Sequence, residues 1–280
     1  MKLYISLDME GIAGTFDWRQ EEKDRDKVRA CIHDQMTWVM EGILKSSRNK
    51  DIEEIVIADS HALGDNLLYK FTEIDPRISI ISGYPRAQYM MPALDSSYDL
   101  VFFIGYHAGV GTPSGAMDHT YSSRRVHKLW INDMAMNESL INAAYAGYYN
   151  IPVGLVVGDA ALQKELYSEG AMPWVKYVVT KESLGKFSSK LISLGKVKES
   201  TINAVAETLD MNFKDLPIYK FNDPIELKIE FNSTAMAEIA SLMPYTNRLD
   251  GRTISFVHED YKTIFDALMA LVTLASTVNA

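Results

Sequence analysis

The chain has 280 residues, of which 47% are hydrophobic and 23% charged, a composition typical of a globular protein with one large or two smaller domains. Its 28 basic and 37 acidic residues give a net charge of −9, which argues against nucleic acid and anionic membranes as partners. The single cysteine, Cys31, excludes an internal disulfide framework and is typical of a reducing compartment.

Neither end of the chain shows a pattern that predicts export or membrane insertion. Only five mostly apolar residues lie between Lys2 and Asp8, fewer than the apolar region of a secretory signal requires. Near the other end, FDALMALVTLASTV includes Asp266 and is too short to span a bilayer. We therefore expect a soluble, cytoplasmic protein.

The first part of the chain predicts strands that alternate with helices. Apolar spacings of three and four predict a helix over residues 22–48, and a second helix is expected over about 138–149. The predicted strands are KLYISL, EEIVIADSH, RISIISGYP, DLVFFIGYH and IPVGLVVGDA. Strands this apolar are typical of a buried, mostly parallel sheet with helices on both faces.

The pattern changes after Gly158-Asp159. Residues 160–222 are richer in lysine and serine, and we expect polar helices there, with a loop near LGKVKES. The segments IELKIEF, STAMAEIASL, RTISFVH and EDYKTIFDALMALVTLAS then predict a β-α-β-α run. The predicted fold is α/β, with one domain over residues 1–160 and a smaller second domain over 161–280.

Side chains that can bind metals follow the predicted strands, and one more, Glu138, opens the second predicted helix. Because functional groups gather beyond the carboxyl ends of parallel strands, we expect these side chains to share one edge of the sheet. Two imidazoles and three carboxylates suit Zn²⁺, with Mn²⁺ or Co²⁺ as alternatives. Five ligands exceed the usual set of one catalytic zinc, whereas two ions about 3.5–4 Å apart, sharing a carboxylate, would use them all. The five are Asp8, Glu10, His61, His107 and Glu138.

Each of these residues also has a purely structural explanation. The stretch DSH that contains His61 is compatible with an ordinary turn or cap, because Asp and Ser favour both. Asp8 and Glu10 before a glycine are compatible with a capped turn. His107 is compatible with a hydrogen-bonded core histidine, and Glu138 is favourable at a helix N-terminus without any metal. Only their shared position at strand ends favours the metal site.

Several longer stretches make the chain resemble the D-aminopeptidase family of the DppA type, which are dinuclear zinc peptidases. The resemblance is carried by LDMEGIAG, ADSHALGDN, GYHAGVGTPSGAMDHTYS and AAYAGYYNIPVGLVVGD, and more weakly by IEFNSTAMAEIASLMP. It implies two Zn²⁺ per subunit, held by Asp8, Glu10, His61, His107 and Glu138, with Asp8 bridging. It also implies a ring-shaped homo-decamer that takes short peptides, in which the second domain contributes to the active-site mouth and to assembly.

The resemblance further assigns a catalytic role to His119, in a glycine-rich loop twelve positions after His107. The family treats this residue as a nucleophile, and a solvated loop histidine is the structural alternative. We favour proton transfer to the leaving amine, because a dinuclear site already activates water and an imidazole titrates near neutral pH. Asp59 is expected either to orient a ligand histidine or to cap a helix.

These features together predict a dizinc aminopeptidase that acts on short peptides with an N-terminal D-residue. An L-specific peptidase or amidase, a two-metal phosphoesterase and a non-catalytic binding protein are the alternatives. The acidic net charge and the absence of a basic cluster near the ligands disfavour phosphate esters.

Overall fold

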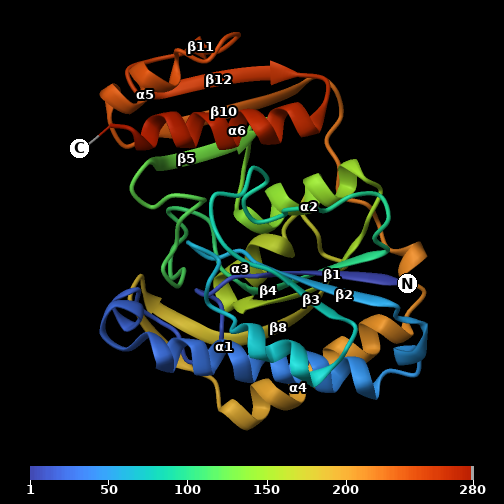
Figure 1. The fold of residues 1–280 in the computed structure, drawn as a ribbon. Coiled ribbons are helices and arrows are strands. Elements are labelled where there is room, and N and C mark those ends of the chain that lie inside the picture. Colours follow the sequence, from blue (N-terminus) through green and yellow to red (C-terminus); the bar gives the residue numbers. More distant parts are fainter. Residues whose placement is uncertain (279–280) are drawn as a thin grey trace.

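The computed structural model describes residues 1–278 and stacks two sheets with helices between and outside them (Figure 1). The larger sheet has the order β3-β2-β1-β4-β7-β8-β9, and only its last pair, β8 with β9, is antiparallel. This confirms the predicted, mostly parallel α/β sheet. Its strands are β1 (Lys2–Leu7), β2 (Glu54–Asp59), β3 (Ile78–Ile81), β4 (Leu100–Tyr106), β7 (Val153–Asp159), β8 (Lys176–Gly185) and β9 (Ser188–Leu191).

Helices cover both faces of this sheet. Helices α1 (Arg19–Lys45) and α4 (Leu194–Asp210) lie on one face, whereas α2 (Glu138–Tyr148) and α3 (Ala160–Leu166) lie on the other (Figure 1). Helix α1 buries Val28, Ile32 and Met36 on the stripe that the sequence predicts, although it begins and ends three residues earlier than expected. Among residues 1–278, no helix has both the length and the apolar character needed to cross a membrane.

The smaller sheet is antiparallel and has the order β11-β12-β10-β5-β6. Along β10 (Ile225–Phe231) every second residue is buried, which is the pattern of a strand with one covered face. The helices that pack on this sheet are α5 (Thr234–Ala240) and α6 (Tyr261–Ser276), so the predicted β-α-β-α run is confirmed. The other strands are β5 (Val126–Ile131), β6 (Met134–Ala135), β11 (Asn247–Arg248) and β12 (Thr253–His258).

The prediction of polar helices and a loop over residues 160–222 is partly wrong. Residues 176–191 form the hairpin of β8 and β9, and LGKVKES begins α4 instead of forming a loop. The alternation along β8 is hidden in the sequence because Thr180, Lys181 and Ser183 are buried although they are polar. Strand β9 lies at the sheet edge and is largely exposed, which explains its serine- and lysine-rich composition.

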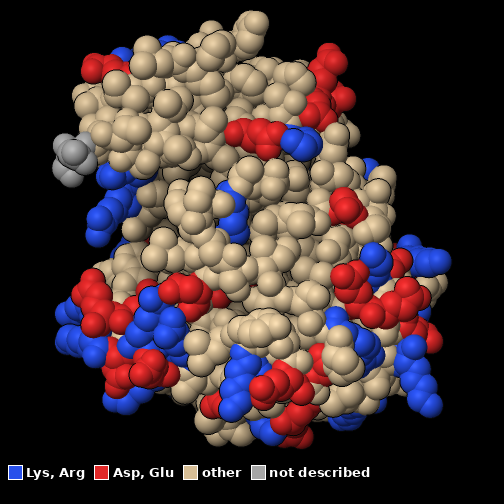
Figure 2. Space-filling model, viewed as in Figure 1, with Lys and Arg blue, Asp and Glu red and all other residues tan. Residues whose placement is uncertain are grey.

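Both sheets include strands from each side of residue 160. Strands β8 and β9 extend the larger sheet, whereas β5 and β6 belong to the smaller one. The two-domain division at residue 160 therefore stays a proposal about folding units, and the sheets do not follow it. Charged side chains gather over the larger sheet with α1 and α4, while the smaller sheet and α6 present a mostly uncharged surface in this view (Figure 2).

Two glycines let the segment after β1 cross the end of β4. The Gly11 N–H donates to the carbonyl oxygen of Gly105 over 2.7 Å, and the Asp8 N–H donates to that of Ile104 over 2.8 Å. Gly105 has φ +81°, and a Cβ there would overlap the Asp8 carbonyl, just as a Cβ on Gly11 would overlap that of Tyr106. Only glycine allows this close backbone contact, which sets the position of Asp8 and Glu10.

Replacing Gly105 with alanine should therefore lower the free energy of unfolding by about 1–3 kcal/mol or more, because both the positive φ and the contact with Asp8 oppose a side chain. Urea denaturation measures this change. Gly195→Ala is the matched control, since nothing lies within 4 Å of a Cβ at this α4 position. Equal stability of the two variants would contradict this account of the crossing.

Candidate metal centre

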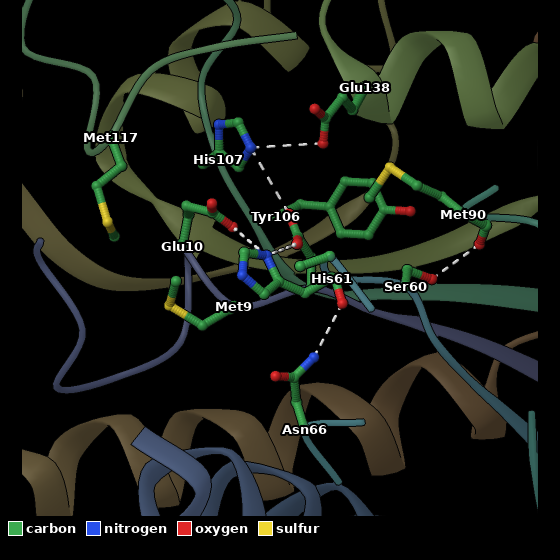
Figure 3. Close-up of polar contacts among 12 residues, drawn as sticks. Met9, Glu10, Ser60, His61, Asn66, Met90, Tyr106, His107, Met117 and Glu138 are labelled. Atoms are coloured by element: carbon green, nitrogen blue, oxygen red, sulfur yellow. Dashed lines mark hydrogen bonds and ion pairs between the residues drawn. The ribbon is translucent and has the colours of Figure 1, made fainter. Parts of the chain in front are cut away.

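The strand ends bring the predicted ligands together. Leu7 in β1 pairs with Asp59 in β2 and with Ile104 in β4, so the three strands end at one edge of the sheet. Asp8, His61 and His107 follow these ends directly or within two residues. Helix α2 begins with Glu138, and its N-cap Asn137 accepts a hydrogen bond from the Leu140 N–H. All five predicted residues and His119 lie in one cluster that is buried except for the partly buried His61 and His119. Figure 3 shows Glu10, His61, His107 and Glu138 of this cluster.

The cluster divides into two groups that share Asp8. The ligand atoms of Asp8, Glu10 and His61 lie within 4.8 Å of one another, and so do those of Asp8, His107 and Glu138. His61 Nδ1 is 3.3 Å from Asp8 Oδ1 and 3.2 Å from Glu10 Oε2. His107 Nε2 is 3.6 Å from Asp8 Oδ2 and 3.4 Å from Glu138 Oε2. Figure 3 shows His61 facing Glu10 and His107 facing Glu138.

A third group of the same kind consists of Glu10, His107 and His119, whose ligand atoms also lie within 4.8 Å of one another. The structure therefore places His119 beside the predicted ligands. Its side chain is only 14% exposed, and its ring stacks on that of His107 at a centroid distance of 4.3 Å and an angle of 4°. Trp18 meets the same ring edge-on at 5.4 Å. His119 is thus a packed residue, and the solvated-loop alternative is wrong.

The unpaired atoms of the cluster fit bound cations. Asp8 Oδ2, Glu10 Oε2 and His107 Nε2 are buried and have no hydrogen-bond partner among the described residues. The second oxygen of each glutamate is occupied: the Trp18 indole N–H donates to Glu10 Oε1 and the Tyr121 N–H to Glu138 Oε1, both over 2.6 Å. Each glutamate therefore keeps one oxygen for a cation, and buried carboxylates need such neutralisation.

Hydrogen bonds on the far side of each ring orient the imidazoles. His107 Nδ1 lies 2.9 Å from the Ala108 carbonyl and His119 Nδ1 lies 3.1 Å from that of Met117, which turns Nε2 of both rings toward the cluster. His61 uses Nδ1 toward Asp8 and places Nε2 3.2 Å from Glu21 Oε2. Such outer partners fix the tautomer of metal-binding histidines.

Burial and the charges of neighbouring residues shift the pKa values of the clustered side chains. Burial, followed by the charge of Glu10, raises the pKa of Asp8 to about 7. Burial alone would also raise the pKa of Glu10, but His61 outweighs it and lowers that pKa well below its usual value. The pKa of His119 is lowered by burial and then by His107, which favours a neutral imidazole.

Several supporting residues were not predicted from the sequence. Lys181 is fully buried, and its ammonium group donates to the carbonyl oxygens of Glu10 and Thr15, fixing the segment that carries two ligands. Burial lowers the Lys181 pKa to about 7. No local signal separates this lysine from the exposed ones near it. Trp18 and Glu21 were also missed, because their role depends on how the start of α1 meets the sheet edge.

Asp59 supports the segment that carries His61. It accepts hydrogen bonds from the N–H groups of Asn66 and Leu67 at 2.6 and 2.9 Å and from the Asn66 side chain at 2.9 Å. The Asn66 amide in turn donates to the His61 carbonyl oxygen over 2.9 Å (Figure 3). Asp59 therefore helps to orient a ligand histidine, which is one of its two predicted roles, and it does so through Asn66 and the His61 backbone.

A cavity of about 300 Å³ opens onto the cluster. It is lined by four carboxylates, namely Asp8, Glu10, Glu21 and Glu138, and Arg124 is the only lysine or arginine among its described lining residues. The tip of the β8–β9 hairpin lies beside it, since Phe187 and Lys186 contact the Trp18 ring at 5.4 and 5.5 Å. Glu21 is the only one of these carboxylates outside the predicted ligand set, so it remains able to attract a cationic or amine-bearing molecule when the ligands are occupied.

Comparisons with known proteins identify one family, one related sequence and one related structure. The family model described as D-aminopeptidase matches residues 1–270. A D-aminopeptidase of Bacillus subtilis (strain 168) is 30% identical over 279 residues, which cover 98% of both chains. The solved structure of "Zn-dependent D-aminopeptidase DppA from Bacillus subtilis, a self-compartmentalizing protease" superposes with a TM-score of 0.90 at 30% identity and full coverage of both chains.

Removing the indole donor beside Glu10 should weaken metal binding. We expect Trp18→Phe to lower Zn²⁺ affinity about 10-fold, because the freed Glu10 carboxylate loses its fixed orientation while the ring contacts remain. Competition with a chromophoric chelator measures this. Trp174→Phe is the matched control, because the Trp174 N–H is buried without a partner among the described residues and lies outside the cluster. Equal affinities for Trp18→Phe and the parent protein would contradict the proposed orientation.

Proposed function

The chain belongs to the D-aminopeptidase family, and from this we propose that it is a zinc-dependent aminopeptidase that releases N-terminal D-residues from short peptides. One observation carries the proposal: two groups of histidine and carboxylate ligands share Asp8 and keep unpaired, buried atoms. Two Zn²⁺ ions per subunit would use this ligand set fully, with Mn²⁺ or Co²⁺ as alternatives.

The residues that would hold the two ions follow from the two groups. Asp8, Glu10 and His61 would bind one ion, and Asp8, His107 and Glu138 the other, so that Asp8 bridges. When bound, such ions act as Lewis acids toward a carbonyl group and lower the pKa of water. The chain's own part is to keep the ligand oxygens aimed at the cluster, through Trp18 and Tyr121.

His119 would move the proton that peptide hydrolysis requires. Its Nδ1 is engaged by the Met117 carbonyl, so Nε2 faces the cluster, 3.7 Å from Glu138 Oε1. A neutral ring in this position accepts a proton and then donates it to the leaving amine. We favour this role over direct nucleophilic attack, because stacking on His107 limits the movement that attack by the ring would need.

The scarcity of basic side chains around the cavity disfavours a phosphate ester as substrate. Four carboxylates line it, and Arg124 is the only basic side chain to meet an anion among the described lining residues. Glu21, the one lining carboxylate outside the proposed ligand set, would instead attract the free amino group of a peptide. A phosphatase assay run beside the peptide assay separates these two functions.

We further propose that the protein is a cytoplasmic homo-oligomer. The relative of known structure is a self-compartmentalizing protease, and a ring-shaped decamer is the assembly that the family resemblance implies. Enclosed active sites would restrict substrates to short or unfolded peptides. Light scattering from the purified protein would then give a mass ten times that of the chain.

The decisive assay measures free amino acid released from matched D- and L-dipeptides and tripeptides, with zinc-loaded and chelator-stripped protein side by side. We expect zinc-dependent release from the D-series alone. Release from the L-series would keep the metal centre and overturn the stereochemistry. No release from either series, with zinc bound, would overturn the peptidase.

Replacing His119 with alanine should separate catalysis from metal binding. We expect kcat to fall about 10²–10⁴-fold, the usual contribution of general acid–base catalysis, while the zinc content stays that of the parent protein. His127→Ala is the control, since His127 is an exposed residue of β5 outside the cluster, and it should keep full activity. An unchanged kcat in His119→Ala would contradict the proton-transfer role.

A further inference from the structure

A second cavity adjoins the metal centre and contains no charged side chain. It has a volume of about 290 Å³ and lies between α6 and the segments that follow β2, β3 and β4. Its lining includes Met269, Val272 and Thr273 from α6 and Leu63 and Tyr84 from the facing loops. No lysine, arginine, aspartate or glutamate is among its described lining residues.

The two cavities share a wall. Ala62, Tyr89, Tyr121 and Ser122 line both the apolar cavity and the one that opens onto the ligands. The Tyr121 N–H donates to Glu138 Oε1 over 2.6 Å, so the same residue contacts a predicted ligand and forms the apolar wall. Tyr121 therefore contacts both the predicted ligand Glu138 and the apolar cavity, so a molecule bound at the ligands would lie next to this cavity.

The shared tyrosines offer ring surface to an occupant. The Tyr121 hydroxyl donates to Asn142 Oδ1 over 2.7 Å, so its polar end is satisfied away from the cavity. The rings of Tyr89 and Tyr121 lie 5.7 Å apart at 47°, and the Arg86 guanidinium covers Tyr89 at 5.5 Å. Burial against such a wall is favourable for an apolar side chain, whereas a charged side chain would lose its hydration there without gaining a partner.

The volume and the uncharged surroundings limit what fits. About 300 Å³ is the lower end of ligand-pocket volumes, which is enough for one large side chain and too small for a whole peptide. No charged side chain is among the described lining residues of this cavity, whereas four carboxylates line the cavity beside it.

We propose that this apolar cavity is a side-chain subsite, which gives the enzyme a preference for leucine-, methionine- or phenylalanine-like residues next to the cleaved bond. This inference rests on the proposed peptidase function. Burial of one such side chain discriminates against alanine by about 10–100-fold in kcat/KM. The side chain belongs either to the N-terminal residue or to the residue after the cleaved bond, and the test separates the two.

The test compares kcat/KM for three dipeptides of the configuration that the protein cleaves: Ala-Ala, Phe-Ala and Ala-Phe. Val272→Trp should fill the cavity and lower the preference for phenylalanine at least 10-fold, at whichever position shows it. Thr273→Trp, at an exposed lining position, is a second variant in case the first does not fold. Asp266→Trp, exposed on α6 outside the lining, is the control and should keep the preference.

Each outcome decides the matter. Loss of the phenylalanine preference in the lining variants alone supports the subsite, and the peptide that loses it identifies the position. Equal cleavage of all three dipeptides by the parent protein, or equal losses for all three in the lining variants, overturns the subsite and leaves the peptidase intact. Cleavage of no dipeptide by the zinc-loaded parent protein overturns the peptidase, and the subsite with it.

Discussion

Three carboxylates are buried together with no lysine or arginine among residues 1–278 to pair with them, and the candidate site depends on this constraint. Asp8, Glu10 and Glu138 are at most 3% exposed, and their nearest cationic partners are histidines. The one buried lysine nearby, Lys181, donates to backbone carbonyls and to the Thr15 hydroxyl, and to no carboxylate. Buried charges of one sign are stable only when cations compensate them. The cluster therefore has the composition and burial of a metal-binding site.

The fold positions each of the candidate ligands. Three parallel strands end at one edge and deliver Asp8, His61 and His107, while the start of α2 adds Glu138. The contact between Gly11 and Gly105 brings the segment after β1 over that edge. Donors outside the cluster then occupy the oxygens that do not face it, as Trp18 does for Glu10. The same edge also borders the apolar cavity, so the candidate metal centre and the proposed side-chain subsite share one wall.

The sequence was sufficient to predict five strands of the larger sheet and to place the five candidate ligands close together, because apolar strands and the polar residues after them are local signals. It was insufficient where burial depends on distant partners. Lys181 looks like a surface residue in the sequence, and only the packing of β8 behind the Glu10 segment shows that it is buried. The hairpin of β8 and β9 was missed for the same reason, since its buried positions are polar. Trp18, Glu21 and the apolar cavity all depend on contacts between segments far apart in the sequence, which periodicity does not report.

The central claim is that Asp8 lies between two metal ions. Anomalous diffraction at the zinc absorption edge, from crystals of the zinc-loaded protein, tests it most directly. The account predicts two peaks in each chain, one contacted by Asp8, Glu10 and His61 and the other by Asp8, His107 and Glu138. A single peak, or two peaks of which Asp8 contacts only one, would contradict it.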